Sequence, residues 1–307
     1  MTMKITALSP WFGSKRTLAP EIVRQLGPHR YYLEPFCGSM AVLMAKDPSA
    51  NETVCDQHGA LTNLARVIQH PELAPQLHER LQRLLYCEDI YKDSKQWLAA
   101  NESRGSATPI DWAYHYFVAS WMGRNGVSGT ARSNYQFTMR WTASGGSGPV
   151  RFAAAVDSLP EWHARLRNVC ILCRDGFGSL EKVEDEKGLA IYCDPPYLLE
   201  TRSDKSGLGR EAGSARYLHE FTEADHVRLA DVLRGFKRAR IVVSYYASPR
   251  LAELYPGWTQ VDCSRQKHLA VQNKRGSKRT EAPEVLIVNG PAASGNSEAI
   301  SLFEGVT

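Results

Sequence analysis

The sequence predicts an α/β fold, with a doubly wound and mostly parallel sheet that is interrupted by one large insertion. Three observations lead to this prediction. Short apolar runs of strand length recur along the chain, helical patterns lie between several of them, and a long gap separates two consecutive runs. With 307 residues, of which 43% are hydrophobic, the chain can bury a substantial core.

Apolar runs of this kind are typical of buried strands, and they are Tyr31–Leu33, Thr53–Cys55, Val169–Leu172, Ala190–Cys193, Ile241–Val243 and Val285–Val288, with Thr259–Cys263 as a weaker candidate. Helical patterns cover Ala41–Ala45 and Glu223–Phe236, between some of these strands. Strands that alternate with helices favour a parallel sheet whose two faces both carry helices.

Residues 60–163 separate the second predicted strand from the third, and this gap is too long for an ordinary connection. We therefore expect residues 60–163 to form an inserted domain, whose first part, from Leu61 to Ala100, is helical. Residues 1–59 and 164–290 would form the main domain. Residues 291–307 are rich in Ala, Gly and Ser, and we expect a disordered tail there.

Composition limits the classes of function only loosely. The net charge of +4 permits a nucleic-acid partner without requiring one. No apolar run reaches the length of about 18 residues that a membrane span needs, and the N-terminus lacks the pattern of a signal peptide. The scattered cysteines favour reduced thiols and a cytoplasmic location. Cys170 and Cys173 lack a second pair at zinc spacing, so we expect no metal.

The segment Asp194-Pro195-Pro196-Tyr197 directly follows a predicted strand, which places it at the edge of the sheet where ligands bind. The two prolines fix the backbone and leave carbonyl groups free as acceptors. Asp194 and the carbonyl of Pro195 can accept the two hydrogens of a planar amine, while Tyr197 can stack on the attached ring. The segment therefore predicts an amine-binding catalytic site, although a rigid turn alone would account for it as a bare tetrapeptide.

A second signal concerns the cofactor. Glu34-Pro35-Phe36-Cys37-Gly38-Ser39 lies between a predicted strand and a helix, where small residues let the backbone approach a ligand. Asp56 ends the next predicted strand, at the position from which an acid typically binds a ribose hydroxyl. Either feature alone also fits an ordinary turn or a solvated loop. Together they indicate a cofactor that carries adenosine.

Two segments have the composition of a DNA-binding surface. The later part of the insertion interleaves aromatic residues with Arg and Asn, although these aromatics also suit a small hydrophobic core. Residues 265–279 carry basic side chains without an acid between them, which suits phosphate contact but also a solvated loop. The candidate DNA-binding residues are Arg124, Asn125, Arg132, Asn134, Arg140, Lys274, Arg275, Lys278 and Arg279.

The order of these motifs resembles that of the DNA adenine methyltransferases of the Dam-like class, bacterial or phage-borne. The matching segments cover about residues 8 to 290, and they are Pro10-Trp11-Phe12-Gly13-Ser14-Lys15, Glu34–Ser39, Asp56, Asp194–Tyr197, Phe221-Thr222 with Asp225-His226, Ile241–Tyr246, and Arg279 with Glu284–Asn289. The resemblance implies a Rossmann-like fold that binds S-adenosylmethionine, and an insertion between the cofactor motif and the catalytic motif that recognises the DNA target.

The resemblance also implies a function: transfer of a methyl group from S-adenosylmethionine to the exocyclic amine of an adenine flipped out of double-stranded DNA. Asp194, Pro195, Pro196 and Tyr197 would be catalytic. The cofactor would contact Trp11, Phe12, Gly13 and Lys15 at its methionine end, Glu34, Pro35, Phe36, Gly38 and Ser39 in a cradle, Asp56 at the ribose, and Asp175 and Phe177 at the adenine. The sequence departs from the family at Met40, where Gly is common, and at Gly176, which separates Asp175 from Phe177.

Alternatives remain open at this point. The same amine chemistry serves methylation of cytosine N4, and a catalytically silent DNA-binding protein could keep the fold. Whether a restriction enzyme accompanies the chain, and which DNA sequence it recognises, cannot be read from the residues. The segment Ala299-Ile300-Ser301-Leu302-Phe303 is similar to peptides that dock on a sliding clamp, although an accidental apolar patch is as good an explanation.

Overall fold

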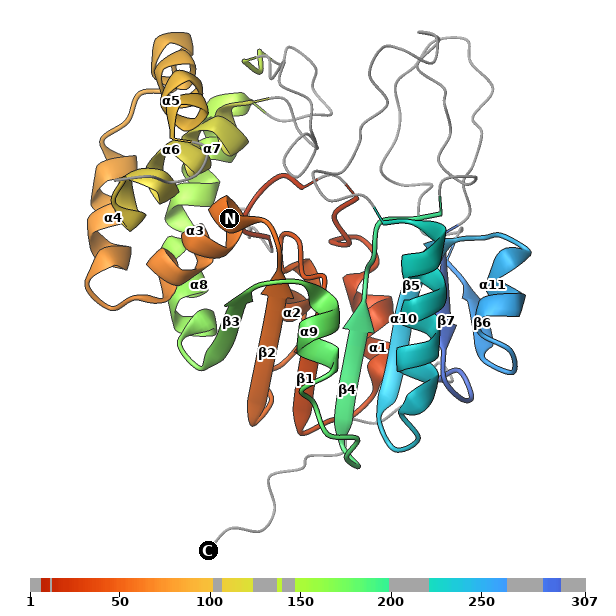
Figure 1. Cartoon of the computed structure of the whole chain (residues 1–307). Coiled ribbons are helices and arrows are strands. Elements are labelled where there is room, and N and C mark those ends of the chain that lie inside the picture. The colour runs from red at the N-terminus through yellow and green to blue at the C-terminus, as the bar shows by residue number, and fades with distance from the viewer. Residues whose placement is uncertain are drawn as a thin grey trace, which may run out of the picture.

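The computed structural model describes residues 7–11, 13–101, 107–123, 137–139, 147–198, 221–263 and 284–293. The described strands form one seven-stranded sheet in the order β3-β2-β1-β4-β5-β7-β6 (Figure 1). They are β1 (Tyr31–Glu34), β2 (Asn51–Asp56), β3 (Val169–Cys173), β4 (Leu189–Cys193), β5 (Arg240–Tyr246), β6 (Thr259–Asp262) and β7 (Glu284–Val288). The apolar runs thus mark all of these strands, and the predicted mixed, mostly parallel sheet is confirmed.

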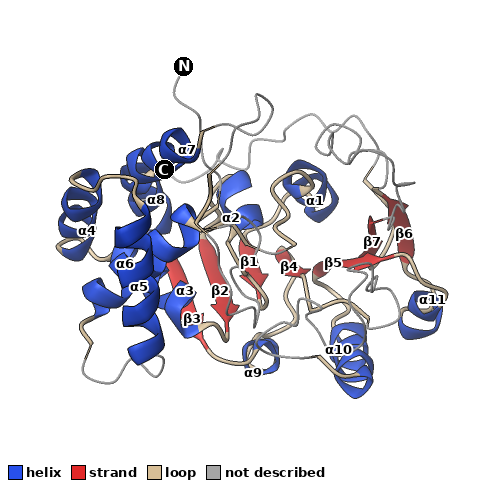
Figure 2. Ribbon diagram, turned by 90° about the horizontal axis from the view of Figure 1, so that it is seen from above, coloured by secondary structure: helices blue, strands red, loops and turns tan. Residues whose placement is uncertain are grey.

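Helices cover both faces of the sheet. In Figure 2, α1 (Ala19–Leu26) and α2 (Ala41–Ala45) lie on one face, and α9 (Gly176–Leu180), α10 (Glu223–Gly235) and α11 (Arg250–Leu254) lie on the other. The start of α10 is fixed by a capping box, in which the Asp225 backbone donates to the Thr222 side chain and the Thr222 backbone donates to the Asp225 carboxylate at 2.8 Å. The helix predicted from the apolar pattern therefore begins where its sequence supplies a cap.

The core consists of two buried clusters, one on each face of the sheet, because successive side chains of a strand point to opposite faces. On the central strands, Tyr32 and Tyr192 belong to the cluster beneath α1 and α2, whereas Leu33 and Ile191 belong to the cluster beneath α9 to α11. Every residue of β4 is buried, as expected for a strand covered on both sides.

Where the structure describes the chain between β2 and β3, its regular elements are helices, apart from one isolated bridge between Gly123 and Phe137. The helices are α3 (Gly59–Gln69), α4 (Leu73–Gln82), α5 (Glu88–Ala100), α6 (Pro109–Met122), α7 (Gly148–Asp157) and α8 (Leu159–Leu166), and they gather beyond β3 in Figure 1. Their buried side chains belong to the same cluster as those of α1 and α2. The role of residues 60–163 as a target-recognition domain stays a prediction. In the described part of the chain, no helix is both long and apolar enough to cross a membrane.

Strand direction decides which residues meet at each edge of the sheet. Strands β1, β2, β3, β4 and β5 are parallel, so their carboxyl ends lie at one edge, which we call the carboxyl edge. Strand β7 is antiparallel to β5, and Glu284, its first residue, is paired with Tyr246 at the end of β5. The first residue of β7 therefore also lies at the carboxyl edge. The segment after β7 lies at the opposite edge.

Candidate active site

Three predicted motifs meet at the carboxyl edge. The segment Glu34–Ser39 begins at the end of β1, Asp56 ends β2, and Asp194–Tyr197 follows β4. Because β1 is paired with both β2 and β4, the three motifs come from adjacent strands. The structure thus brings together residues that are far apart in the sequence, at the edge where a doubly wound sheet binds its ligands.

Lys15 connects the N-terminal segment to the motif after β4. Its ammonium nitrogen, Nζ, lies 2.8 Å from Asp194 Oδ2 and 3.4 Å from Glu284 Oε1. The same nitrogen donates a hydrogen bond of 2.7 Å to the carbonyl of Gly13, and Gly13 adopts a φ of 74° that favours glycine. A buried ammonium therefore lies between two carboxylates at the centre of the candidate site.

Tyr197 lies beside this ammonium. Its hydroxyl donates to Glu284 Oε1 at 2.8 Å, and its ring centroid is 5.0 Å from Lys15 Nζ. The ring meets that of Tyr246 edge-on, with centroids 4.5 Å apart. Only 6% of Tyr197 is exposed. Its hydroxyl is held by Glu284, and its ring is held by Lys15 and Tyr246.

The environment of Asp194 changes its acidity. Burial raises the pKa of its carboxyl to about 6, although the Lys15 ammonium and the Tyr197 hydroxyl act in the opposite direction, and the negative charge of Glu284 raises it further. The side chain nevertheless keeps 21% of its surface exposed. Asp194 is therefore an accessible acceptor that is ionised only above mildly acidic pH.

The turn after β1 approaches its neighbours closely. Gly38 has a φ of 44°, and a Cβ atom at this position would lie 2.8 Å from Nε1 of Trp11. The Gly38 N–H donates to Asp56 Oδ2 at 2.9 Å, while Asp56 Oδ1 accepts from the N–H of His58 at 2.8 Å. Glycine is thus required at this turn, and the orientation of the Asp56 carboxylate is fixed by two backbone groups.

The departure at Met40 has a structural consequence. Met40 adopts a φ of 58°, in the left-handed region, and is the one non-glycine residue with positive φ among the described residues. A side chain in this conformation costs about 1–2 kcal/mol, and Met40 is also fully buried. The hydroxyl of the preceding residue, Ser39, lies 3.1 Å from the hydroxyl of Ser14. This hydrogen bond connects the segment Glu34–Ser39 to the N-terminal segment.

Glu34 lies beneath the cradle and is almost fully buried. Its Oε2 accepts a hydrogen bond of 2.9 Å from the hydroxyl of Tyr32, two residues earlier on the same face of β1. Burial is the main cause that raises the pKa of the Glu34 carboxyl to about 8, and the nearby Asp194 contributes. Glu34 is therefore mostly protonated at neutral pH, and it supports the turn without adding a full charge.

Gly176 lets α9 pack against the cradle. A Cβ at this position would lie 2.6 Å from Cε1 of Phe36 and 2.7 Å from the carbonyl oxygen of Pro35. Asp175 and Phe177, which flank Gly176 and are both predicted to contact the adenine of the cofactor, lie in different environments. Asp175 accepts from the Gln57 amide at 3.1 Å near the surface, whereas Phe177 is buried.

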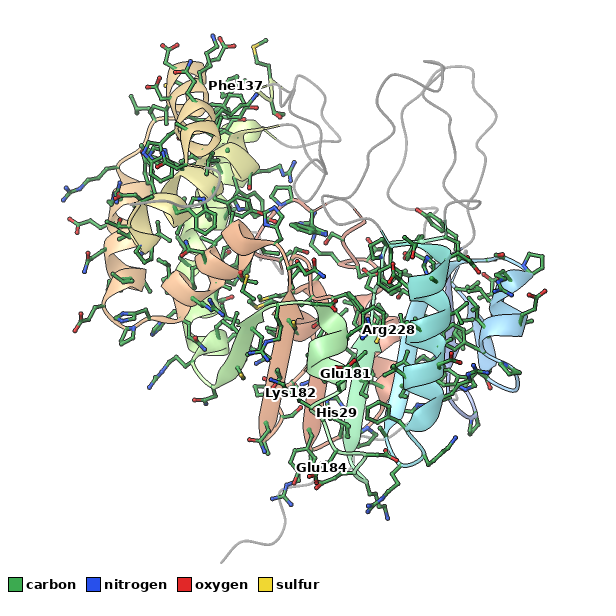
Figure 3. All side chains as sticks on the ribbon, in the orientation of Figure 1. His29, Phe137, Glu181, Lys182, Glu184 and Arg228 are labelled. Atoms are coloured by element: carbon green, nitrogen blue, oxygen red, sulfur yellow. The ribbon has the colours of Figure 1, made fainter. Side chains whose placement is uncertain are left out.

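Phe177 belongs to an aromatic cluster between α9 and α10. Its ring is nearly parallel to that of Phe221, with centroids 5.8 Å apart, and it meets the ring of Phe36 edge-on at 6.4 Å. The Arg228 guanidinium lies 4.1 Å from the centroid of Phe177 and forms an ion pair of 2.8 Å with Glu181. Figure 3 labels Arg228 and Glu181, which lie close together on this face of the sheet. Phe177 is therefore packed among aromatic rings rather than exposed to solvent, and its contact with the cofactor stays a prediction.

Several predicted site residues lie outside the described part of the chain, namely Phe12 and all of the candidate DNA-binding residues, Arg124, Asn125, Arg132, Asn134, Arg140, Lys274, Arg275, Lys278 and Arg279. Glu284 was not predicted as a site residue, because a carboxylate before an apolar run gives no sign of strand direction. Within the described residues, no group of three or more His, Cys, Asp or Glu side chains is arranged to hold a metal ion.

The chain is similar to known proteins at two levels, a family and an individual relative. The family model of the D12 class N6 adenine-specific DNA methyltransferases matches residues 11–275 of the chain. The Retron Ec67 DNA adenine methylase of Escherichia coli is 22% identical over 289 residues, which are 93% of this chain and 92% of that protein. The first match contains every described element from α1 to β6.

Proposed function

The chain belongs to the D12 class of N6 adenine-specific DNA methyltransferases, and from this premise we propose that the segment Asp194–Tyr197 supplies its catalytic residues. The predicted activity, methylation of adenine N6 in DNA, is confirmed by that membership, and the family implies S-adenosylmethionine as methyl donor. The alternatives of cytosine methylation and of a silent DNA-binding protein are disfavoured on the same ground. The residue roles that follow are proposals.

Asp194 acts as the acceptor for the adenine amine. A carboxylate has two oxygens with several acceptor positions, and the Asp194 side chain, whose Oδ2 lies 2.8 Å from Lys15 Nζ, keeps 21% of its surface exposed for the amine. The carbonyl of Pro195 accepts the second amine hydrogen. Both acceptors stabilise the positive charge that develops on the amine nitrogen as it attacks the methyl group. When bound, S-adenosylmethionine would supply that methyl group from a sulfonium sulfur, whose bond to carbon breaks to leave a neutral thioether, and the methylated amine would then release one proton to the Asp194 carboxylate or to water.

Tyr197 stacks on the target adenine after the base has left the duplex. Base flipping is part of the proposal, because an exocyclic amine within a base stack cannot reach a carboxylate at a sheet edge. Since the Tyr197 ring is buried, the entering base displaces groups around it, while the hydrogen bond to Glu284 keeps the hydroxyl end fixed.

The turn around Gly38 fits S-adenosylmethionine. The glycine lets the backbone of this turn lie directly against the Trp11 ring, where a Cβ would lie 2.8 Å from Nε1, and Asp56 lies at the end of the next strand. The residues that would hold the donor are Trp11, Phe12, Gly13 and Lys15 at the methionine end, Glu34, Pro35, Phe36, Gly38 and Ser39 in the cradle, Asp56 at the ribose, and Asp175 and Phe177 at the adenine.

One observation carries the proposed site: Asp194, paired with Lys15, lies at the same sheet edge as Gly38 and Asp56. The test is to incubate the protein with methyl-labelled S-adenosylmethionine and unmethylated duplex DNA, and then to identify the labelled base. We expect N6-methyladenine with the wild type and none with Asp194→Asn, which should still bind the donor. Methylation by Asp194→Asn at the wild-type rate would refute the role of Asp194.

We further propose that residues 60–163 recognise double-stranded DNA, together with the basic segment 265–279. The measurement is the dependence of duplex affinity on salt concentration. Replacement of Lys274 and Arg275 by Ala should weaken binding to all sequences and reduce the slope of log affinity against log salt by about one for each phosphate that is no longer neutralised. Replacement of Asn134 by Ala should instead change which sequence is preferred.

The C-terminal segment is proposed to dock on a sliding clamp. The backbone N–H of Ala293 donates to Gln25 at 2.9 Å, and the carbonyl of Pro291 accepts from Arg240 at 2.9 Å, so the chain after β7 is held at the edge opposite Asp194. A peptide of residues 294–307 that does not bind purified clamp at high micromolar concentration would refute this proposal.

A further inference from the structure

Glu284 is a buried carboxylate of the site that was not predicted from the sequence as a site residue, although it begins the motif Glu284–Asn289 and accepts from the Tyr197 hydroxyl. It is the first residue of β7, and only 6% of it is exposed. Because β7 runs against β5, Glu284 lies opposite Tyr246 at the carboxyl edge. A charge at this depth is retained only where partners compensate for its loss of water.

The partners of Glu284 are themselves site residues. Its Oε1 accepts from the Tyr197 hydroxyl at 2.8 Å and lies 3.4 Å from Lys15 Nζ. Lys15 in turn lies 2.8 Å from Asp194 Oδ2. Two carboxylates, one ammonium and one phenol therefore form a continuous network, in which Glu284 is the member farthest along the chain from the other three.

We propose that Glu284 is a positioning residue for methyl transfer: it anchors the hydroxyl of Tyr197 and holds the Lys15 ammonium between itself and Asp194. This inference rests on the proposed catalytic roles of Asp194 and Tyr197. Without the anchor, the Tyr197 ring would lose its fixed orientation toward the base. Without the second carboxylate, Lys15 would pair more closely with Asp194 and compete with the amine for its oxygens.

The effect of Glu284 on the pair of Lys15 and Asp194 can be measured as a change in how the methylation rate depends on pH. The charged or titratable groups around Asp194 come from several elements: Lys15 before α1, Glu34 at the end of β1, Tyr192 in β4, Tyr197 after it, and Glu284 in β7. The negative charge of Glu284 raises the pKa of Asp194, so its removal should lower that pKa. The acidic limb of the rate profile should then move to lower pH.

The chain offers a matched control. Glu52, in β2, is also buried, and it forms ion pairs with Lys46 and Arg165 near the start of the strand, away from the carboxyl edge. Glu52→Gln removes a buried carboxylate from beside an ammonium, just as Glu284→Gln does. If the role of Glu284 is only structural, both variants should lose stability, and neither should change the pH profile.

The experiment measures single-turnover methylation of duplex DNA at saturating donor, from pH 5 to 9, for Glu284→Gln, Glu284→Ala, Tyr197→Phe, Glu52→Gln and the double variant Tyr197→Phe/Glu284→Ala. Glu284→Gln keeps an acceptor for the phenol, so we expect its acidic limb to move to lower pH with a modest loss of rate. Glu284→Ala and Tyr197→Phe should each lose roughly tenfold to 100-fold, and the double variant should be no slower than the slower single variant.

Several results would overturn the proposal. These are an acidic limb that does not move in Glu284→Gln, a double variant whose loss equals the product of the two single losses, or a Tyr197→Phe rate equal to that of the wild type. A wild-type rate in Tyr197→Phe refutes the anchor even where the Glu284 variants fail to fold, and thermal unfolding reveals such a failure. Failure of the proposed function is distinct, because the wild type would then leave adenine unmethylated or Asp194→Asn would remain active.

Discussion

Replacement of Lys15 by Met should reduce the rate of methylation at neutral pH and leave it recoverable at alkaline pH. The ammonium lies 2.8 Å from Asp194 Oδ2, and it opposes the effect of burial, which raises the pKa of that carboxyl to about 6. An opposite charge at this distance typically lowers a carboxyl pKa by about 1–3 units, so its loss should raise the pKa of Asp194 to roughly 7–9. The ionised fraction at pH 7 would then fall from about 90% to between about 50% and 1%.

The expected rate at pH 7 is therefore lower by about twofold to 90-fold, and the loss should shrink as the pH rises toward 9. The assay is single-turnover methylation at saturating donor, which separates this effect from weaker donor binding. Lys46→Met is the control, because Lys46 is also buried and paired with a carboxylate, Glu52, but lies away from the site. A Lys15→Met loss that is the same at every pH would refute the electrostatic reasoning.

Three further substitutions test the site. Gly176→Ala places a Cβ 2.7 Å from the Pro35 carbonyl oxygen and should lower the free energy of unfolding by about 1–3 kcal/mol in denaturant titrations. Met40→Gly relieves about 1–2 kcal/mol of backbone strain but removes a buried side chain worth about 2–5 kcal/mol, so calorimetry should show a lower Tm. Burial raises the pKa of Asp194 to about 6, so the stability that this carboxyl contributes is present below pH 4 or so and is lost as the pH rises through 6. At pH 8 the free energy of unfolding of Asp194→Asn should therefore exceed that of the wild type by roughly 1–3 kcal/mol. A denaturation midpoint below that of the wild type would contradict the raised pKa of Asp194.

The parts of the molecule that depend on local pattern could be predicted from the sequence. Apolar runs located β4, β5 and β7 because strands buried on both faces need apolar residues throughout, whereas half-exposed β6 gave only a weak run. The segment Asp194–Tyr197 could be placed because it directly follows β4. Met40 and Gly176, where the sequence departs from the family pattern, both lie at positions with unusual backbone conformation or packing. Met40 is strained in the left-handed conformation that Gly would adopt without cost, and at position 176 the close approach of Phe36 admits no side chain larger than that of glycine.

The contacts between these parts could not be predicted. Lys15 is an ordinary loop lysine until the fold brings it within 2.8 Å of Asp194. Phe177 and Asp175 are close in the sequence, yet one is buried against Phe221 and the other accepts from Gln57 near the surface. Such outcomes depend on how separate elements pack, and no pattern within a short window contains that information.

Glu284 shows how one change of strand direction shapes the chemistry of the site. In a wholly parallel sheet, the residue that begins a strand lies at the edge opposite the ligands, where Glu52 lies in this protein. The reversal of β7 instead brings its first residue beside Tyr246, within 2.8 Å of the Tyr197 hydroxyl. The site thereby gains a second carboxylate without a further loop. That carboxylate lets one ammonium be shared, so that Lys15 can favour the ionised form of Asp194 without neutralising it completely.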